Sequence, residues 1–189
     1  MKIFYFAHKL KSLMKERPEQ NIKLKIAVVT GGHESEYKYS LISARNAIAG
    51  LEYTNKYRIK LIVITPEMKW IFLDDHKNFL KNPGVNGFDK SRGLESHQAL
   101  AKMKKENVDV AFLTAMGPMG ESGEIQGFLE TAGIPYTGSS VSASALAMDK
   151  IKSSLLLRAA GLNTPDFIYF NGMDWKRRES EIIRQSEKK

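Results

Sequence analysis

The chain has 189 residues, of which 42% are hydrophobic and 26% charged, a composition typical of a folded globular domain and not of a disordered or fibrous protein. It contains no cysteine, so disulfides, thiolate metal sites and cysteine nucleophiles are excluded. The net charge of +8 is concentrated at the two ends of the sequence and leaves a nearly neutral body, so nucleic acid is not favoured as a partner.

Residues 1–24 form an extra basic segment ahead of the first strand-like run. Residues 1–25 contain seven Lys or Arg against two Glu, and their apolar residues have the spacing of an amphipathic helix. The apolar run at 3–7 is too short for a signal-peptide core or a membrane span. We therefore expect an additional helix, no membrane span and a cytoplasmic location.

From residue 25 onward, strand-like and helix-like segments alternate. Apolar and β-branched runs predict strands at 26–29, 58–65, 70–73, 108–113, 134–137 and 167–170. Apolar residues at helical spacing predict helices at 41–51, 94–107, 125–132 and 149–160. Ser40 is expected to cap the first helix, and the polar stretch 74–93 to be a surface excursion. The alternation predicts an α/β fold with a largely parallel sheet and flanking helices.

Two glycine-containing loops, at residues 30–40 and 116–123, follow predicted strands, and 138–140 forms a third possible rim. In such sheets ligands bind at the carboxyl ends of the strands, where glycine lets the backbone approach closely. Glu34 and Glu36 lie in the first loop. Each carboxylate either complements the dipole of the next helix or binds a cationic group of a small ligand, and composition alone leaves both interpretations open.

Several common motifs are missing. After Gly31 and Gly32 the next glycine is Gly50, so the dinucleotide fingerprint G-x-G-x-x-G is not formed, and no phosphate loop of the type G-x-x-x-x-G-K-[ST] occurs. The four histidines have no metal-ligand spacing, and no residue is assigned to a metal.

Four blocks, in the same order, resemble the D-alanine–D-alanine ligases. They are KIAVVTGGHESE at 25–36, GPMGESGEIQG at 117–127, GIPYTGS at 133–139 and SASALAMDK at 142–150. The resemblance implies that residues 25–165 form a Rossmann-like domain of the pre-ATP-grasp kind. Residues 166–189 resemble only the first strand and helix of an ATP-grasp domain.

The resemblance also implies an activity, namely ATP- and Mg²⁺-dependent joining of two D-alanines for peptidoglycan synthesis. By position, Glu36 matches the glutamate that holds the ammonium group of the first D-alanine. The neighbouring residues of the implied substrate loops are Gly31, Gly32, Ser40 and Gly117. Lys150 matches a lysine that reaches the nucleotide phosphates.

The sequence departs from the family pattern in three places. Met116 stands where the family usually has His, Lys38 and Tyr39 stand where an acid and a valine are common, and Ser122 replaces the acid of a G-E-D-G pattern. These changes concern the recognition of D-alanine and leave the expected fold unaffected.

The family's adenine pocket and Mg²⁺-binding carboxylates would lie beyond residue 189. We therefore expect this chain to lack turnover alone, with a complementing ATP-grasp fragment or a homodimer as possible assemblies. The alternative is a non-catalytic binding or oligomerisation module derived from the ligase. The second substrate stays open, since relatives that make other D-alanyl products share these motifs.

Overall fold

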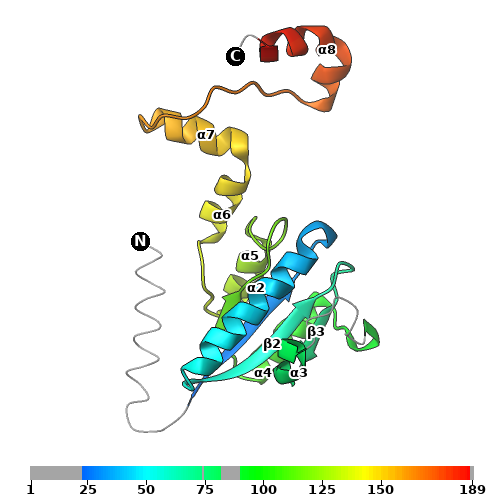
Figure 1. Ribbon diagram of the computed structural model, residues 1–189, viewed down its shortest axis with the longest axis vertical. Coiled ribbons are helices and arrows are strands. Elements are labelled where there is room, and N and C mark those ends of the chain that lie inside the picture. The colour runs from blue at the N-terminus through cyan, green and yellow to red at the C-terminus, as the bar shows by residue number, and fades with distance from the viewer. Residues whose placement is uncertain (1–22, 74, 82–89, 188–189) are drawn as a thin grey trace. The chain divides into compact units, whose positions relative to one another are not determined.

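The computed structural model describes residues 23–73, 75–81 and 90–187. The chain divides into two compact units, residues 1–145 and 146–189 (Figure 1). The helix expected near the N-terminus lies in residues 1–22, outside the described residues. The domain boundary expected after residue 165 stays a prediction that rests on the family resemblance.

Unit 1 is built on a four-stranded sheet. Its strands are β1 (Leu24–Gly31), β2 (Tyr57–Ile64), β3 (Trp70–Leu73) and β4 (Val110–Leu113), in the order β3-β2-β1-β4. The central strand β1 pairs in parallel with β2 and β4, so Val28 lies between Leu61 and Phe112. The edge strand β3 runs antiparallel to β2. This confirms the predicted α/β fold with a largely parallel sheet.

Helices cover both faces of this sheet. They are α2 (Glu34–Tyr53), α3 (His76–Lys81), α4 (Ser96–Lys105) and α5 (Glu124–Thr131), and Figure 1 shows α2 lying along the strands. Ile26 and Val28 belong to one buried cluster with residues of α2 and α3, whereas Ala27 and Val29 belong to another with residues of α4 and α5. Since successive side chains of a strand point to opposite faces, β1 must be apolar throughout.

Three local expectations for unit 1 are wrong. Helix α2 begins at Glu34, because the Nδ1 atom of His33 accepts from the Ser35 N–H at 3.4 Å, so Ser40 lies inside the helix instead of capping it. The stretch 74–93 is not only a surface excursion, because Phe79 in α3 belongs to the core and is only 3% exposed. The strand expected at 134–137 is reduced to a single bridge between Ala111 and Tyr136.

The remaining elements are the short 3₁₀ helix η1 (Lys90–Arg92), α6 (Val141–Met148), α7 (Lys150–Ala159) and α8 (Gly172–Glu187). The predicted helix at 149–160 is confirmed as α7, and the Asp149 side chain caps it by accepting from the Lys152 N–H at 3.0 Å. The strand predicted at 167–170 is wrong, since none of the residues of unit 2 up to 187 forms a strand. No helix in the described parts is long and apolar enough to span a membrane.

Candidate substrate-binding site

The glycine turn after β1 brings the chain directly from the sheet into α2. Gly31 and Gly32 have φ values of +89° and +106°, a region that side-chain-bearing residues rarely adopt. A Cβ on Gly31 would lie 2.1 Å from the carbonyl oxygen of Ile64, and the Gly32 N–H donates to the same oxygen at 2.8 Å. The two glycines therefore fix the close approach of β1 and β2 at the edge where the site lies.

One face of α2 holds the loop that follows β4. Glu36, Ser40 and Ser43 lie on this face at positions i, i+4 and i+7. The Ser40 hydroxyl accepts from the Met116 N–H at 2.9 Å and donates to the Glu36 carbonyl at 3.1 Å. The Ser43 hydroxyl contacts the Met116 sulfur at 3.6 Å. Ser40 thus anchors the loop to α2, and its expected place in a substrate loop stays a prediction.

The Glu36 side chain lies against Gly117. A Cβ built on Gly117 would come within 2.5 Å of the Glu36 Cγ atom, and the φ of Gly117 is +69°. The Gly117 N–H donates to a Glu121 carboxylate oxygen at 2.7 Å. The second glycine loop, 116–123, therefore meets the first turn of α2 at Glu36.

The Glu36 side chain is half-buried, whereas Glu34 in the same helical turn is exposed. Among the described residues, the Glu36 carboxylate has neither a hydrogen-bond partner nor an ion-pair partner. A partly desolvated carboxylate of this kind is suited to accept charge-assisted hydrogen bonds from an ammonium group. The geometry thus favours the ligand interpretation for Glu36 and the helix-dipole interpretation for Glu34.

Side chains in and just after the second loop form hydrogen bonds to its backbone. The buried Gln126 side chain donates to the Gly120 carbonyl at 2.9 Å, and the Ser122 hydroxyl accepts from the Met119 N–H at 2.8 Å. Sequence reasoning missed Ser43 and Gln126 as loop supports. The helical spacing from Glu36 could have indicated Ser43, but no local pattern indicates that Gln126 turns back towards Gly120.

Lys150 is the first residue of α7 in unit 2, where its exposed ammonium group donates to the Ala147 carbonyl at 3.2 Å. Its expected role towards nucleotide phosphates stays a prediction. Within the described ranges, no three His, Asp or Glu side chains gather to hold a metal ion. These ranges therefore supply no ligand set to which an Mg²⁺ ion can be assigned.

Comparison with known proteins finds a family model that covers most of unit 1. Residues 25–139 match the family model described as D-ala D-ala ligase N-terminus, a range that contains Glu36 and both glycine loops. The chain belongs to the D-alanine–D-alanine ligase family. It is 32% identical over 180 residues to the D-alanine–D-alanine ligase of Chloroherpeton thalassium. The match covers 88% of this chain and 49% of that ligase.

Two solved structures of ligases resemble the chain as well. The VanG D-Ala:D-Ser ligase from Enterococcus faecalis is 29% identical with a TM-score of 0.63, and the match covers 88% of this chain and 49% of that one. The D-alanine–D-alanine ligase from Coxiella burnetii is 26% identical with a TM-score of 0.67, covering 87% and 49%. The chain thus spans about half the length of the ligases it matches.

Proposed function

We propose that unit 1 is the D-alanine-binding part of an ATP-dependent D-alanine–D-alanine ligase. The observation that carries the proposal is the half-buried Glu36 carboxylate, which lies against Gly117 and has no partner among the described residues. In this role Glu36 accepts hydrogen bonds from the ammonium group of D-alanine. The substrate carboxylate is then held in one orientation, so Glu36 acts by positioning and not by covalent chemistry.

ATP and Mg²⁺ enter this proposal through the family alone. Among the described residues no cluster of three His, Asp or Glu side chains gathers to hold Mg²⁺, and Lys150 is matched to the nucleotide phosphates by the resemblance alone. We propose that turnover needs an ATP-grasp polypeptide to complement this chain, and that the chain alone hydrolyses no ATP. Peptidoglycan synthesis in the cytoplasm is the setting that this activity implies.

Binding of D-alanine to the purified chain tests the proposal. We expect Glu36→Gln to weaken the binding at least tenfold, because a hydrogen bond to a charged group contributes about 1.5–3 kcal/mol. Glu34→Gln is the matched control, since it removes the same charge from the same helical turn at an exposed position. Equal loss in both variants, or binding unaffected by Glu36→Gln, would exclude the proposed role.

ATP hydrolysis provides the second measurement. Phosphate release with Mg²⁺ and D-alanine is expected to stay at background for the chain alone. Turnover that disappears in Glu36→Gln would show that the chain carries a complete active site, and the part of the proposal that requires a complementing polypeptide would be wrong.

The alternative function is a non-catalytic binding or oligomerisation module. Met116 favours it, because a thioether that contacts Ser43 replaces the imidazole expected from the family resemblance. A module of this type would form a homodimer and would bind D-alanine no better than L-alanine. Sedimentation equilibrium and the ratio of the two alanine affinities distinguish it from the ligase half.

A further inference from the structure

The side of α2 that faces away from the sheet carries an uncharged row of exposed residues. Tyr39 and Ile42 are 58% and 44% exposed, and Asn46 and Ala49 continue the row as exposed residues. The solvent side of a surface helix normally carries charged residues, and this row has none. We call these four residues the outer row of α2. Because all four are exposed, no part of the described chain covers them.

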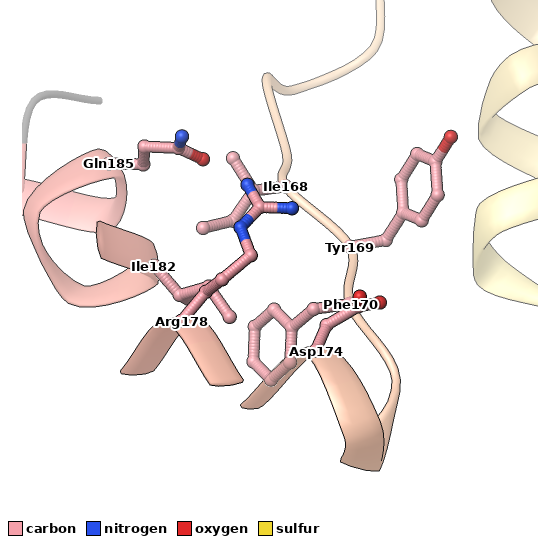
Figure 2. A pocket seen from close by; sticks show the side chains of 7 residues that line it. All are labelled: Ile168, Tyr169, Phe170, Asp174, Arg178, Ile182 and Gln185. Carbon is pink, nitrogen blue, oxygen red and sulfur yellow. The ribbon is translucent and has the colours of Figure 1, made fainter. Parts of the chain in front are cut away.

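Apolar side chains next to α8 show what a covered surface looks like in this protein. Ile168 and Phe170 are directed towards α8, where Ile182 is buried (Figure 2). The Phe170 ring also stacks on Trp175, with 5.5 Å between the ring centroids. The outer row of α2 has no comparable neighbour among the described residues, so it is the stronger candidate for a surface that another segment covers.

The outer row has the spacing of a contact between two helices. Its residues, at positions 39, 42, 46 and 49, are separated by three, four and three positions. Such alternation keeps side chains on one line where two helices pack at a small crossing angle. A second helix with the same spacing is therefore the occupant that fits the row best.

The basic segment at the start of the chain repeats this spacing. Residues 1–22 lie outside the described residues, and in their sequence Ile3, Phe6, Leu10 and Leu13 are also separated by three, four and three positions. The lysines at positions 2, 9, 11 and 15 fall outside this apolar row. Both rows would extend about 15 Å along a helix, so they match in length as well as in spacing.

The connection to the described chain lies at the end of α2. The ammonium group of Lys23, the first described residue, donates to the Asn55 side chain at 2.6 Å, just beyond the last residue of α2. Between Leu13 and Lys23, residues 14–22 can span up to about 30 Å when extended. Ala49 is one helical turn, or about 6 Å, from the end of α2, so this connection is long enough.

The charge of the segment suits the same end of α2. The last turn of α2 holds no basic residue, and its unpaired carbonyls form the negative end of the helix dipole. If the segment runs in the same direction as α2, Lys15 and Arg17 follow its apolar row and arrive at this end. The parallel direction therefore combines the shortest connection with a favourable placement of two cations.

We propose that residues 3–14 form a helix that packs on the outer row of α2 and runs parallel to it. The matching rows place Ile3 near Tyr39 and Leu10 near Asn46. The segment would thereby stabilise the helix that carries Glu36. This inference does not rest on the proposed function, because it uses the side of α2 that the candidate site does not use.

Hydrogen exchange of the full chain tests the packing. A helix of about 12 residues is marginal in water unless it packs on something, so protection of 3–14 reports the contact. We expect these amides to exchange at least tenfold more slowly in the unaltered chain than in Ile42→Asp, which places a charge in the outer row. Amides of β1 that stay protected show that the variant is folded.

Met68→Asp is the matched control for this experiment. Met68 is 46% exposed between β2 and β3, so the substitution adds the same charge at a similarly exposed apolar residue away from the outer row. It should change the exchange of 3–14 less than twofold. Equal exchange of 3–14 in Ile42→Asp and in the unaltered chain would overturn the proposal.

Disulfide cross-linking tests the register independently, since the chain has no cysteine of its own. Leu10→Cys combined with Asn46→Cys should form a disulfide within one chain, because the proposed register places these two side chains opposite each other. Leu10→Cys with Lys105→Cys is the control, since Lys105 is exposed on α4, which packs on the other face of the sheet. Equal cross-linking in both pairs, or none in the first pair, would overturn the proposal.

Two other occupants would give different results. Cross-links between chains, together with protection of 3–14 that rises with protein concentration, would assign the outer row to a second copy. Protection of 3–14 that appears only when phosphatidylserine vesicles are added would assign the basic segment to an anionic lipid surface. Either result would overturn the proposal.

Discussion

Gly117 and Gly133 share the same backbone dihedral, a φ of +69°, but only Gly117 has another side chain against it. A methyl group on Gly117 would meet the Glu36 side chain, whereas nothing lies within 4 Å of the corresponding position on Gly133. Substitution by alanine strains the backbone at both positions, but only at Gly117 does it also disturb the candidate site. Comparing the two variants therefore distinguishes backbone strain from loss of the contact with Glu36.

We expect Gly133→Ala to lower the free energy of unfolding by about 1–2 kcal/mol through left-handed strain, with D-alanine binding unchanged. Gly117→Ala carries the same strain and also displaces Glu36, so we expect it to weaken D-alanine binding at least tenfold. Denaturant unfolding and binding calorimetry measure the two effects. If Gly117→Ala binds D-alanine normally, the contact between Gly117 and Glu36 does not position the carboxylate.

Tyr37 follows Glu36 in the chain but packs into the core, and burial, with a smaller contribution from the Glu67 charge, raises its pKa to about 12. An unfolded tyrosine titrates near pH 10, so between about pH 10 and 12 the unfolded chain loses this proton first. The stabilising contribution of Tyr37 is therefore complete below pH 10 and is lost as the pH rises towards 12. Tyr37→Phe should make the decline of unfolding free energy over this range shallower.

Denaturant titrations from pH 9 to 12 check this prediction, with Tyr53→Phe as the control. Tyr53 is 94% exposed, so folding hardly changes the surroundings of its hydroxyl group. Parallel pH profiles of Tyr37→Phe and the unaltered chain would contradict the argument from burial.

At the scale of elements, α2 positions the second loop through Ser40. The hydroxyl is fully buried, and without it the Met116 N–H loses its acceptor. We expect Ser40→Ala to lower the free energy of unfolding by about 1–3 kcal/mol and to speed hydrogen exchange at Met116. Ser43→Ala should have a smaller effect, since it removes only the long contact to sulfur. Equal rates of hydrogen exchange at Met116 in Ser40→Ala and Ser43→Ala would show that the loop does not depend on the Ser40 hydroxyl.

Helix α7 depends on its cap more than on packing, because none of its residues is buried. Hydrogen bonds from the Lys152 ammonium group and, to a smaller extent, from the Lys152 N–H lower the pKa of Asp149. The stabilising contribution of the ionised carboxylate is therefore present at neutral pH and is lost as the pH falls through that lowered value. We expect the amides in the first turn of α7 to be less protected from hydrogen exchange at acid pH than at neutral pH, after correction for the intrinsic exchange rates. Asp149→Asn keeps an acceptor that does not titrate, and should remove this pH dependence.

The sequence predicted the elements of unit 1 better than their ends and contacts. The β1 run predicted a strand buried on both faces, because only a parallel sheet covered by helices suits so continuous an apolar run. The start of α2 was misplaced, because serine is a preferred cap and histidine is not, yet the glycine turn lets the helix begin at once after His33. The contact of Glu36 with Gly117 could not be predicted from spacing, because it depends on β4 pairing directly with β1.

At the scale of the whole molecule, the two units should differ in stability. Unit 1 contains both clusters of the buried core, whereas in unit 2 the Ile182 side chain is the buried one among described residues. We expect a chain that ends after Met148 to unfold within about 5 °C of the full chain. Scanning calorimetry measures this difference. A larger fall in the midpoint would show that unit 2 stabilises unit 1.

The backbone of 167–170, which pairs with no described strand, has a consequence for the life of the chain in a cell. An open strand edge beside exposed leucines is what molecular chaperones and quality-control proteases recognise, and it also promotes aggregation. While this edge stays open, the amount of the chain should follow the capacity of the proteolytic machinery more than its rate of synthesis.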